Sequence, residues 1–385
     1  MLIPRPTKLR HSIASKIRHP HIDTTQVRQL VSAYDLDTFK GRTQFAIGPG
    51  RSHNLILETN SGRKVVKRYK FSLDREAILY EHSVLKHLVT TGFAAPRLVL
   101  NRNGETFTAI GDHYYAITDF VAGFKYTDFF ISRRKQKRFI AQAARALARY
   151  HQLIDGFVPQ GKKFDGFRPD GQRRWLEYDW HQTEWDKYKS LLKDRERNGT
   201  QLERFFLHNI DRLQESLVDL GQRFQSDNRL LPKLVIHGDY GPYNLLFQRG
   251  QLAAVLDFEC THFDWRAWEV IGAIYRFAGT KKGIDYDKAT TFLSAYQSRL
   301  VLTNDEIAAM PDVFRFSRLR ALTICFRDYF EFAVSSRLGD ASHMVWWMDW
   351  MEGNAKELTG KLLECRQELL FENSPTSAAL NRTRT

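Results

Sequence analysis

The chain contains few cysteines, and their positions suggest no shared chemistry. Cys260, Cys325 and Cys365 are the only three in 385 residues. Their odd number and wide separation indicate neither a disulfide framework nor a C-x-x-C zinc site. The chain also lacks a run of about 18 uncharged apolar residues, which a membrane span needs. Its first 30 residues include basic side chains but no apolar segment of a secretory signal. These absences predict a cytoplasmic protein with no membrane partner.

Internal repeats are absent as well, since no pattern recurs with a period of about 20 to 50 residues. Apolar residues make up 43% and aromatic residues 13% of the chain, with 27 Phe and 8 Trp. This composition excludes a chain that is mainly disordered. A length of 385 residues allows two or three domains with a sizeable core.

Acidic residues are in the minority: 44 Asp and Glu stand against 58 Lys and Arg, for a net charge of +14. Such an excess suits a nucleic-acid binder or a protein with a pocket for anionic ligands. The basic residues fall in separate segments, namely the first 18 residues, Lys125–Arg138, Lys162–Arg174 and the end of the tail. Scattered segments of this kind are typical of a solvated surface, so a nucleic-acid partner is not expected.

Composition and turn signals divide the chain into four parts. We predict a flexible basic arm over 1–22, a small lobe with a leading helix over 23–122, a larger helical lobe over 123–371, and a disordered tail over 372–385. In the first lobe, apolar runs around Leu55 and Val66 flank a turn and predict a hairpin. A helix from Leu73 to Thr91 is expected with Ser72 as its N-cap.

The second lobe shows mainly helical patterns. We predict a helix over Lys135–Leu153, two short strands within Leu234–Phe258, and helices over Pro311–Leu370 that are split at Gly339. The chain is therefore expected to be α+β, with a small strand-rich lobe followed by a larger helical one.

The most informative segment is LVIHGDYGPYNLLFQRGQLAAVLDFE, which covers Leu234–Glu259. Gly250-Gln251 fits a two-residue hairpin turn of type II′. Pairing outward from this turn places Asn244 opposite Asp257, with Cβ atoms about 4.5–5.5 Å apart. An amide and a carboxylate oxygen at this point suit Mg²⁺. A register shifted by one residue would remove this inference, because the side chains would change faces.

Asp239 precedes Asn244 by five residues, in the loop after the apolar strand Leu234–Ile236. It is therefore expected beside the proposed metal. Phosphoryl transfer needs this combination: one carboxylate to orient the acceptor hydroxyl, and oxygen ligands to hold the metal on the phosphates. Taken singly, each of these residues has an alternative role in forming a turn.

The first lobe supplies an independent set of parts. Glu81 falls within the apolar stripe of its helix, and a buried carboxylate is costly unless it is paired. Lys67, in the preceding strand, is the expected partner, and a Lys held by a Glu is how a kinase directs its ammonium at nucleotide phosphates. The alternative is that Glu81 lies at the edge of the stripe and is solvated. The turn Gly48–Gly50 could bring backbone N–H groups over phosphates.

These parts occur in the order glycine loop, Lys67, Glu81, apolar strand, Asp239, Asn244 and Asp257. The motif HGDYGPYN, followed by LDFE, resembles the aminoglycoside phosphotransferase and choline kinase family, which has a protein-kinase-like fold. The resemblance covers Thr24–Phe277 in order, and TTQVRQLVSAYDL is similar to the opening helix of homoserine-kinase-type members. It implies a two-lobe fold with a small antiparallel sheet and one key helix in the first lobe.

The resemblance also implies ATP and Mg²⁺ as cofactors, Asp239 as catalytic base, and Asn244 and Asp257 as metal ligands. It makes Lys67 the phosphate-contacting lysine and Glu81 its helix partner. The nucleotide site would also include the loop residues Gly50 and Asn54 and the hinge residues Thr118, Asp119, Phe120 and Val121.

At two points the chain departs from the family pattern, which limits the roles that the resemblance assigns to its residues. Glu269 stands where the family more often has Asp, so no role is assigned to it. The HRD and Ala-Pro-Glu signatures of protein kinases are missing, so a protein substrate is not expected.

The implied activity is transfer of the ATP γ-phosphoryl group to a hydroxyl of a small acceptor. The opening helix favours an amino alcohol, such as homoserine or choline, over an aminoglycoside or a sugar. Aromatic residues accompany acids in Trp175–Tyr188 and Met344–Glu352, where they would suit an amine; the alternative is that they only pack helices together. A nucleotide-binding pseudokinase and a basic nucleic-acid binder remain alternatives from other classes.

Overall fold

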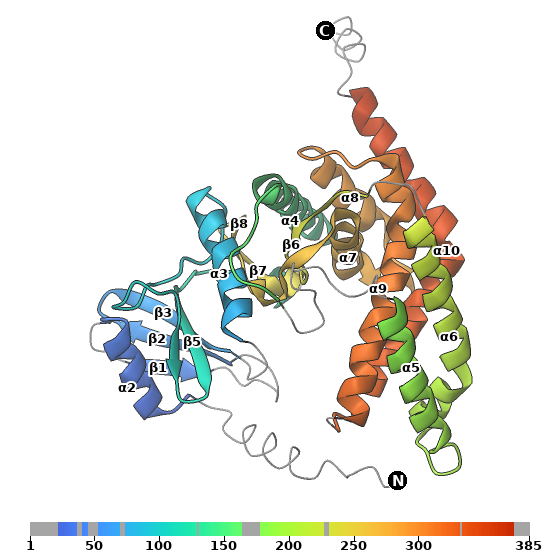
Figure 1. Ribbon diagram of the computed structural model, residues 1–385. Helices are drawn as coiled ribbons and strands as arrows, with labels where there is room; N and C mark the ends of the chain where they lie inside the picture. The colour runs from blue at the N-terminus through green and yellow to red at the C-terminus, as the bar shows by residue number, and fades with distance from the viewer. Residues whose placement is uncertain are drawn as a thin grey trace, which may run out of the picture.

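The computed structural model describes residues 22–36, 41–44, 53–69, 74–128, 131–163, 178–226, 231–331 and 333–372. Residues 1–21 of the predicted arm (1–22), residues 373–385 of the predicted tail (372–385) and the glycine turn with Gly50 lie outside the described residues. Figure 1 shows a small sheet with α2 and α3 at one end of the molecule and a group of long helices at the other. The elements β6–β8, α4 and α7 lie between them. The predicted α+β class, with a small sheet lobe before a helical lobe, is confirmed.

The small lobe is built on a five-stranded sheet whose paired strands are all antiparallel. Its strands are β1 (Gly41–Gln44), β2 (His53–Thr59), β3 (Gly62–Arg68), β4 (Thr108–Ile110) and β5 (His113–Asp119), in the spatial order β1-β2-β3-β5-β4. The predicted hairpin is β2–β3, with Thr59 paired to Gly62 across a two-residue turn. Leu55, Leu57 and Val66 are fully buried, so their alternation places one face of the hairpin on the core.

Two helices accompany this sheet, α2 (Thr24–Ala33) and α3 (Arg75–Thr90). Asp23 caps α2 in a reciprocal capping box with Gln26. The expected N-cap of α3 at Ser72 is wrong, since the side chain of Asp74 accepts the hydrogen bond from the N–H of Ala77. Both residues suit a cap, and the actual helix begins two residues later than the apolar pattern indicated.

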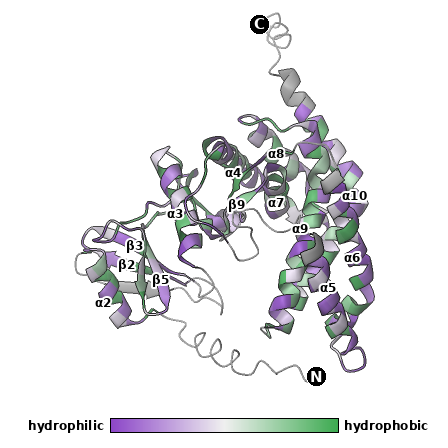
Figure 2. Ribbon diagram, viewed as in Figure 1, coloured by the Kyte–Doolittle hydropathy of each residue, from purple (hydrophilic) through white to green (hydrophobic). Residues whose placement is uncertain are grey.

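The larger lobe consists mainly of helices joined by short strands. Its elements are η1 (Tyr126–Asp128), α4 (Arg133–Ile154), α5 (Tyr178–Lys193), α6 (Gln201–Ser226), β6 (Lys233–Ile236), η3 (Pro242–Asn244), β7 (Leu245–Gln248), β8 (Gln251–Val255), η4 (Phe258–Cys260), β9 (His262–Trp265), α7 (Arg266–Ala278), β10 (Gly279–Thr280), β11 (Gly283–Ile284), α8 (Tyr286–Gln297), α9 (Asn304–Phe330) and α10 (Arg337–Glu372). In Figure 2 the outer helices α6 and α10 alternate between hydrophilic and hydrophobic residues along their length. No helix among the described residues is long and apolar enough to cross a membrane.

The predicted helix break at Gly339 is wrong. α9 ends at Phe330, and Gly339 lies inside the first turn of α10. Glycine costs only about 1 kcal/mol in a helix interior, and burial of the adjacent Leu338 and Ala341 outweighs this cost. Pro311 lies inside α9 rather than at a helix start.

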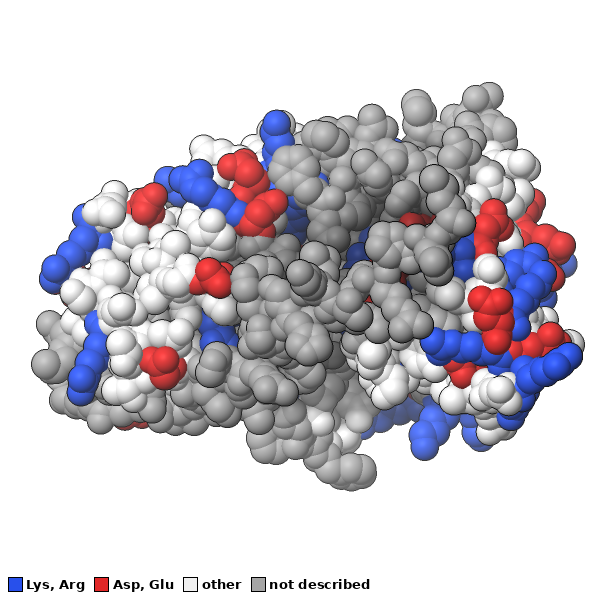
Figure 3. All heavy atoms as spheres, turned by 60° about the horizontal axis from the view of Figure 1, so that its bottom comes forward, with Lys and Arg blue, Asp and Glu red and all other residues white. Residues whose placement is uncertain are grey.

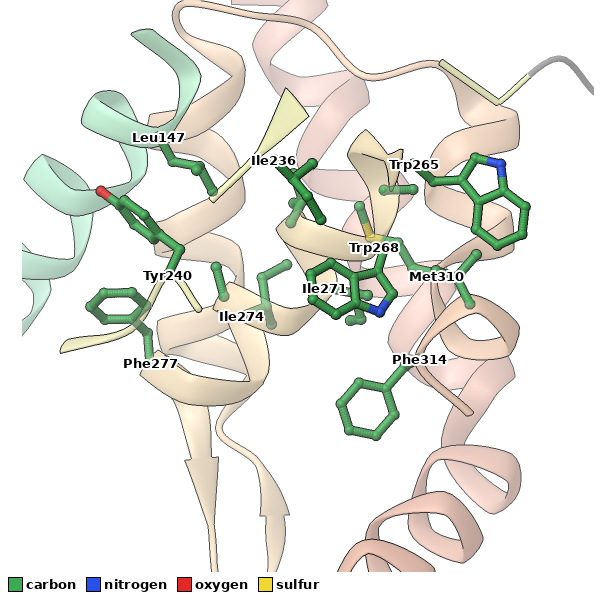
Figure 4. Close-up of a cluster of buried hydrophobic side chains, with 14 of the residues drawn as sticks. Leu147, Ile236, Tyr240, Trp265, Trp268, Ile271, Ile274, Phe277, Met310 and Phe314 are labelled. Atoms are coloured by element: carbon green, nitrogen blue, oxygen red, sulfur yellow. The ribbon is translucent and has the colours of Figure 1, made fainter. Parts of the chain in front are cut away.

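The core of the larger lobe is centred on α7. Figure 4 shows Ile271, Ile274 and Phe277 of this helix among side chains from several other elements, including Ile236, Tyr240, Met310 and Phe314. Most of these side chains are almost fully buried. Since Ile236 and Tyr240 flank the loop after β6, the packing of α7 fixes the place of that loop.

The excess of basic residues is scattered on the face drawn in Figure 3. Lys and Arg lie on both flanks of this face and are interleaved with Asp and Glu. Ion pairs between exposed side chains also occur in the described residues, such as Arg212 with Asp349 at 2.7 Å. Exposed pairs of this kind contribute little to stability.

Buried histidines should make folding stability sensitive to acid. The ring of His82 is enclosed, with Nε2 2.8 Å from the Tyr69 hydroxyl and Nδ1 2.7 Å from Thr106 Oγ1. Burial, together with the charge of Lys67, lowers the pKa of His82 from 6.5 to about 3. Below about pH 6.5, His82 therefore binds a proton in the unfolded chain but stays neutral in the folded chain. The free energy of unfolding consequently falls as the pH drops.

We expect the contribution of His82 to lower the free energy of unfolding by about 2 kcal/mol between pH 6.5 and pH 5. Urea unfolding at pH 7.5, 6.5 and 5 measures this change. His82→Gln should reduce the pH dependence by that amount, whereas the exposed His208 changed to Gln should leave it as in the wild type. Equal slopes in the wild type and His82→Gln would contradict the assignment.

Candidate functional site

The loop that carries Asp239 begins directly after the buried strand β6. Gly238 has φ +80, and a Cβ at this position would lie 2.2 Å from the carbonyl oxygen of Cys260. Only glycine fits both the conformation and the close approach. The glycine of the HGD motif therefore lets the loop pass tightly over the segment that follows Asp257.

Glu269 of α7 anchors the start of this loop. Its Oε2 accepts hydrogen bonds from the backbone N–H of His237 at 2.9 Å and from Nε2 of His151 at 3.0 Å, and its Oε1 accepts from the N–H of Gly238 at 2.7 Å. Burial alone would raise the pKa of Glu269, but the bonds from His151 and the backbone hold it below its usual range. Burial lowers the pKa of His151. The pair is thus an ionised carboxylate beside a neutral imidazole.

Sequence reasoning assigned no role to Glu269, although a signal was present. Glu269 interrupts the apolar run of α7 and is 2% exposed, which is the same pattern that singled out Glu81. A carboxylate in a buried helical stripe needs donors, and here two of them are backbone groups of the HGD motif.

His237 connects the Asp239 loop to the strand that leads into Asp257. Its Nε2 lies 2.9 Å from the carbonyl oxygen of Leu256, and its Nδ1 accepts a hydrogen bond of 3.2 Å from the N–H of Asp239. This pattern fits the tautomer with its hydrogen on Nε2. The histidine therefore fixes the two predicted site segments relative to each other.

The carboxylate of Asp239 is held by three side-chain donors. Oδ1 accepts from the Tyr243 hydroxyl at 2.6 Å and from Nη2 of Arg276 at 3.0 Å, and Oδ2 accepts from Nδ2 of Asn244 at 3.1 Å. The side chain of Asp239 is 30% exposed. Arg276 comes from α7 and was not among the predicted residues, because nothing in its local sequence marks it.

The predicted register of the β7–β8 hairpin is wrong by one residue. Arg249 and Gly250, both with positive φ, occupy the centre of the turn, and a bulge follows between Leu246 and Phe247. Positive φ at both central positions defines a type I′ turn rather than type II′. Asn244 consequently lies opposite Leu256, whose N–H donates to its carbonyl oxygen at 2.8 Å. Asn244 does not lie opposite Asp257.

Asp257 leaves the hairpin in a left-handed conformation with φ 62 and ψ 70. Such a conformation is costly for a residue other than glycine. Its side chain is 52% exposed, and Oδ1 lies 3.5 Å from Nζ of Lys67. The turn thus directs Asp257 toward the small lobe, while Asn244 stays with Asp239.

Lys67 is surrounded by carboxylates from both lobes. Besides Asp257, its Nζ lies 3.1 Å from Oε1 of Glu81 and 3.2 Å from Oε2 of Glu259. The ion pair expected between Lys67 and Glu81 is present, and Glu81 is 4% exposed, so the solvated alternative is wrong. Burial lowers the pKa of Lys67, but Glu81 and Glu259 together raise it well above its ordinary value. Glu259 was not among the predicted site residues.

The other predicted nucleotide residues fall on β2, on β5 and in the segment after β5. Asn54 pairs with Lys67 across the β2–β3 hairpin. Asp119 and Phe120 donate their backbone N–H groups to the carbonyls of Arg97 at 2.9 Å and Arg63 at 3.2 Å. Thr118 lies within β5, Val121 lies just beyond it, and Gly50 is outside the described residues.

In the described part of the chain, the two aromatic and acidic clusters contribute to packing and to ion pairs. Trp185 and Tyr188 of the first cluster are fully buried in the core. In the second cluster Asp349 pairs with Arg212, and Glu352 pairs with Arg315 at 2.7 Å. The structure therefore favours the packing role for these segments.

Together, the sheet lobe with its Lys–Glu pair and the helical lobe with its HGD loop define a phosphotransferase of the kinase-like architecture. Residues 45–300 match the phosphotransferase enzyme family. The chain belongs to this family.

Similar proteins fall within the same group. The chain is 26% identical over 312 residues to a homoserine kinase of Phenylobacterium zucineum, covering 80% of this chain and 86% of that protein. Its fold is similar to that of an amicoumacin kinase solved with AMP-PNP, Ca²⁺ and Ami, with a TM-score of 0.61, 12% identity and coverage of 90% and 96%. It is also similar to a microcompartment-associated aminopropanol kinase, with a TM-score of 0.57, 15% identity and coverage of 88% and 100%.

Proposed function

We propose that the chain transfers the γ-phosphoryl group of ATP to the hydroxyl of a small amino alcohol. One observation carries the proposal, namely that Asp239 and Lys67 are connected across the two lobes. His237 accepts a hydrogen bond from the N–H of Asp239 and lies within hydrogen-bond distance of the carbonyl oxygen of Leu256. The next residue, Asp257, lies 3.5 Å from Nζ of Lys67 in the other lobe. A base for the acceptor and a cation for the phosphates are thus held in one framework. The homoserine and aminopropanol kinases among the similar proteins support an amino-alcohol acceptor.

On the nucleotide side, Lys67 would contact phosphate oxygens while Glu81 fixes its position. Gly50, Asn54 and the hinge Thr118–Val121 would complete the site. Because the N–H groups of Asp119 and Phe120 already have carbonyl acceptors, Val121 is the better donor for adenine. Among hydrogen bonds of the described residues, its N–H is not used.

Asn244 and Asp257 would hold Mg²⁺, and their chemistry fits that ion. Nδ2 of Asn244 donates to Asp239, so its amide oxygen is left for a cation, and Asp257 offers a half-exposed carboxylate. No group of three or more His, Cys, Asp or Glu that could hold a metal occurs in the described part of the chain. Mg²⁺ usually binds only a few protein ligands, and nucleotide oxygens complete its coordination shell. When bound, the ion would neutralise charge on the phosphates.

Asp239 would act on the acceptor. A carboxylate has about four acceptor positions, and three are filled by Tyr243, Arg276 and Asn244. The remaining position can accept the hydrogen of the acceptor hydroxyl. Asp239 would orient that oxygen toward the γ-phosphorus and take its proton as the new O–P bond forms.

ADP release in the presence of Mg²⁺ and ATP tests the proposal. We expect stimulation by hydroxylated amines from a panel of homoserine, 3-aminopropanol, ethanolamine and choline, and a much weaker response to neutral sugars. Stimulation by sugars or aminoglycosides without any response to the amines would exclude the amino-alcohol assignment while leaving a small-molecule kinase.

A further inference from the structure

Among the described residues, Arg318 of α9 has no carboxylate partner. Its guanidinium lies over two aromatic rings, 5.0 Å from the centre of Tyr275 and 4.7 Å from that of Phe314. Its Nε is buried and has no hydrogen-bond partner among the described residues. Nε of the neighbouring Arg315 is buried without a partner as well, but the guanidinium of Arg315 pairs with Asp312 and Glu352 through Nη1 and Nη2.

Two neighbouring residues of α7 connect this cation to the proposed catalytic base. Tyr275, whose ring contacts Arg318, immediately precedes Arg276, and Arg276 binds Oδ1 of Asp239 at 3.0 Å. Burial and then the positive charge of Arg276 lower the pKa of Arg318 to about 10, while the charge of Asp239 opposes the change. Arg318 is therefore still charged at neutral pH, and it interacts electrostatically with both Asp239 and Arg276.

The local balance of charge favours an anionic ligand group. Two guanidinium groups, those of Arg276 and Arg318, act on the carboxylate of Asp239, while the carboxylate of Glu269, which also acts on Arg276, is already held by the loop N–H groups and His151. The aromatic rings stabilise Arg318 in part, but a partly buried guanidinium with a free Nε remains costly until an anion pairs with it. Asp349 and Glu352, two of the acids that could have recognised an amine, are already paired with arginines.

We infer that the acceptor carries a carboxylate as well as its hydroxyl, and that Arg318 binds this carboxylate. This inference rests on the proposed function. A planar guanidinium donates two parallel hydrogen bonds to a carboxylate. Arg318 would then select a hydroxy amino acid over the same alcohol without the acid group. Its role is specificity, because Asp239 and the phosphate-binding groups serve both kinds of acceptor.

Homoserine and 3-aminopropanol form a matched pair, since the second is the first without its carboxylate. In wild type we expect kcat/KM for homoserine to exceed that for 3-aminopropanol by about 10- to 100-fold, the usual effect of a charge-assisted pair. Arg318→Gln should remove most of this preference and change kcat/KM for 3-aminopropanol less than threefold. Arg318→Lys should restore part of it. Arg327→Gln, on the same helix, serves as the control and should keep the preference.

Calorimetric binding of both compounds to the ADP complex separates the two proposals. Homoserine binding that requires Arg318, without any ADP release, would support the carboxylate site and contradict the kinase assignment. ADP release with equal kcat/KM for both compounds would overturn the carboxylate site alone. An equal loss for both acceptors in Arg318→Gln would also overturn it, because it would place Arg318 on the transferred phosphoryl group. Absence of both binding and release would contradict both proposals.

Discussion

Replacing Asp239 with Asn should lower kcat for acceptor-dependent ADP release by about 10³-fold, within the range for loss of a general base. Asparagine keeps the size of the side chain but cannot take the proton of the acceptor hydroxyl. Its amide also cannot accept well from Tyr243, Arg276 and Asn244 at once. ATP affinity should change less than threefold, because Lys67 and Glu81 are untouched. Steady-state kinetics with a separate ATP-binding titration measures both effects.

Tyr243→Phe is the matched control for this substitution. It removes one donor to Oδ1 of Asp239 but leaves the carboxylate and Arg276, so we expect kcat to fall about tenfold or less. ADP production that is unchanged in Asp239→Asn would indicate a nucleotide-binding pseudokinase. A tight ATP complex with no acceptor-dependent turnover in the wild type would indicate the same.

The sequence was sufficient for parts of the site that depend on local pattern. The hairpin pattern places Lys67 opposite Asn54, and the helical stripe places Glu81 in the core. The ion pair between Lys67 and Glu81 then follows from the cost of an unpaired buried charge. The HGD motif likewise marks a loop after a buried strand. Each of these conclusions requires only residues near one another in the chain.

Features that depend on register or on distant contacts could not be predicted. Gly250-Gln251 and Arg249-Gly250 are both acceptable turns, and the choice between them shifts the pairing of Asn244. A positive φ at an arginine is uncommon enough that the sequence favoured the other turn. Arg276 and Arg318 show no local signal either, since their importance arises from the packing of α7 and α9 around Asp239.

Glu269→Gln should produce the second large effect, on stability and activity together. Glutamine cannot accept from both N–H groups of the loop and from His151, and its own NH₂ would face donors. Each buried donor left without an acceptor costs about 1–3 kcal/mol, so the loss of these bonds should cost about 3–5 kcal/mol in all. We expect the free energy of unfolding to fall by that amount in urea denaturation. We also expect kcat to fall about 100-fold at a temperature where the variant stays folded, because the Asp239 loop loses its position.

A second buried carboxylate separates these two effects. Glu306 pairs with Arg266 at 2.6 Å and is fully buried, and among the described residues its carboxylate accepts from Arg266 and from the N–H of Thr303 rather than from the HGD loop. Glu306→Gln should therefore lower stability by a similar amount while leaving kcat of the folded protein within about twofold, because the bonds that hold the loop to Glu269 remain. Glu269→Asp keeps the charge and should recover most of kcat. If Glu269→Gln and Glu306→Gln both retain kcat, the carboxylate of Glu269 contributes only to folding, and the position of Asp239 is set by Tyr243, Arg276 and Asn244.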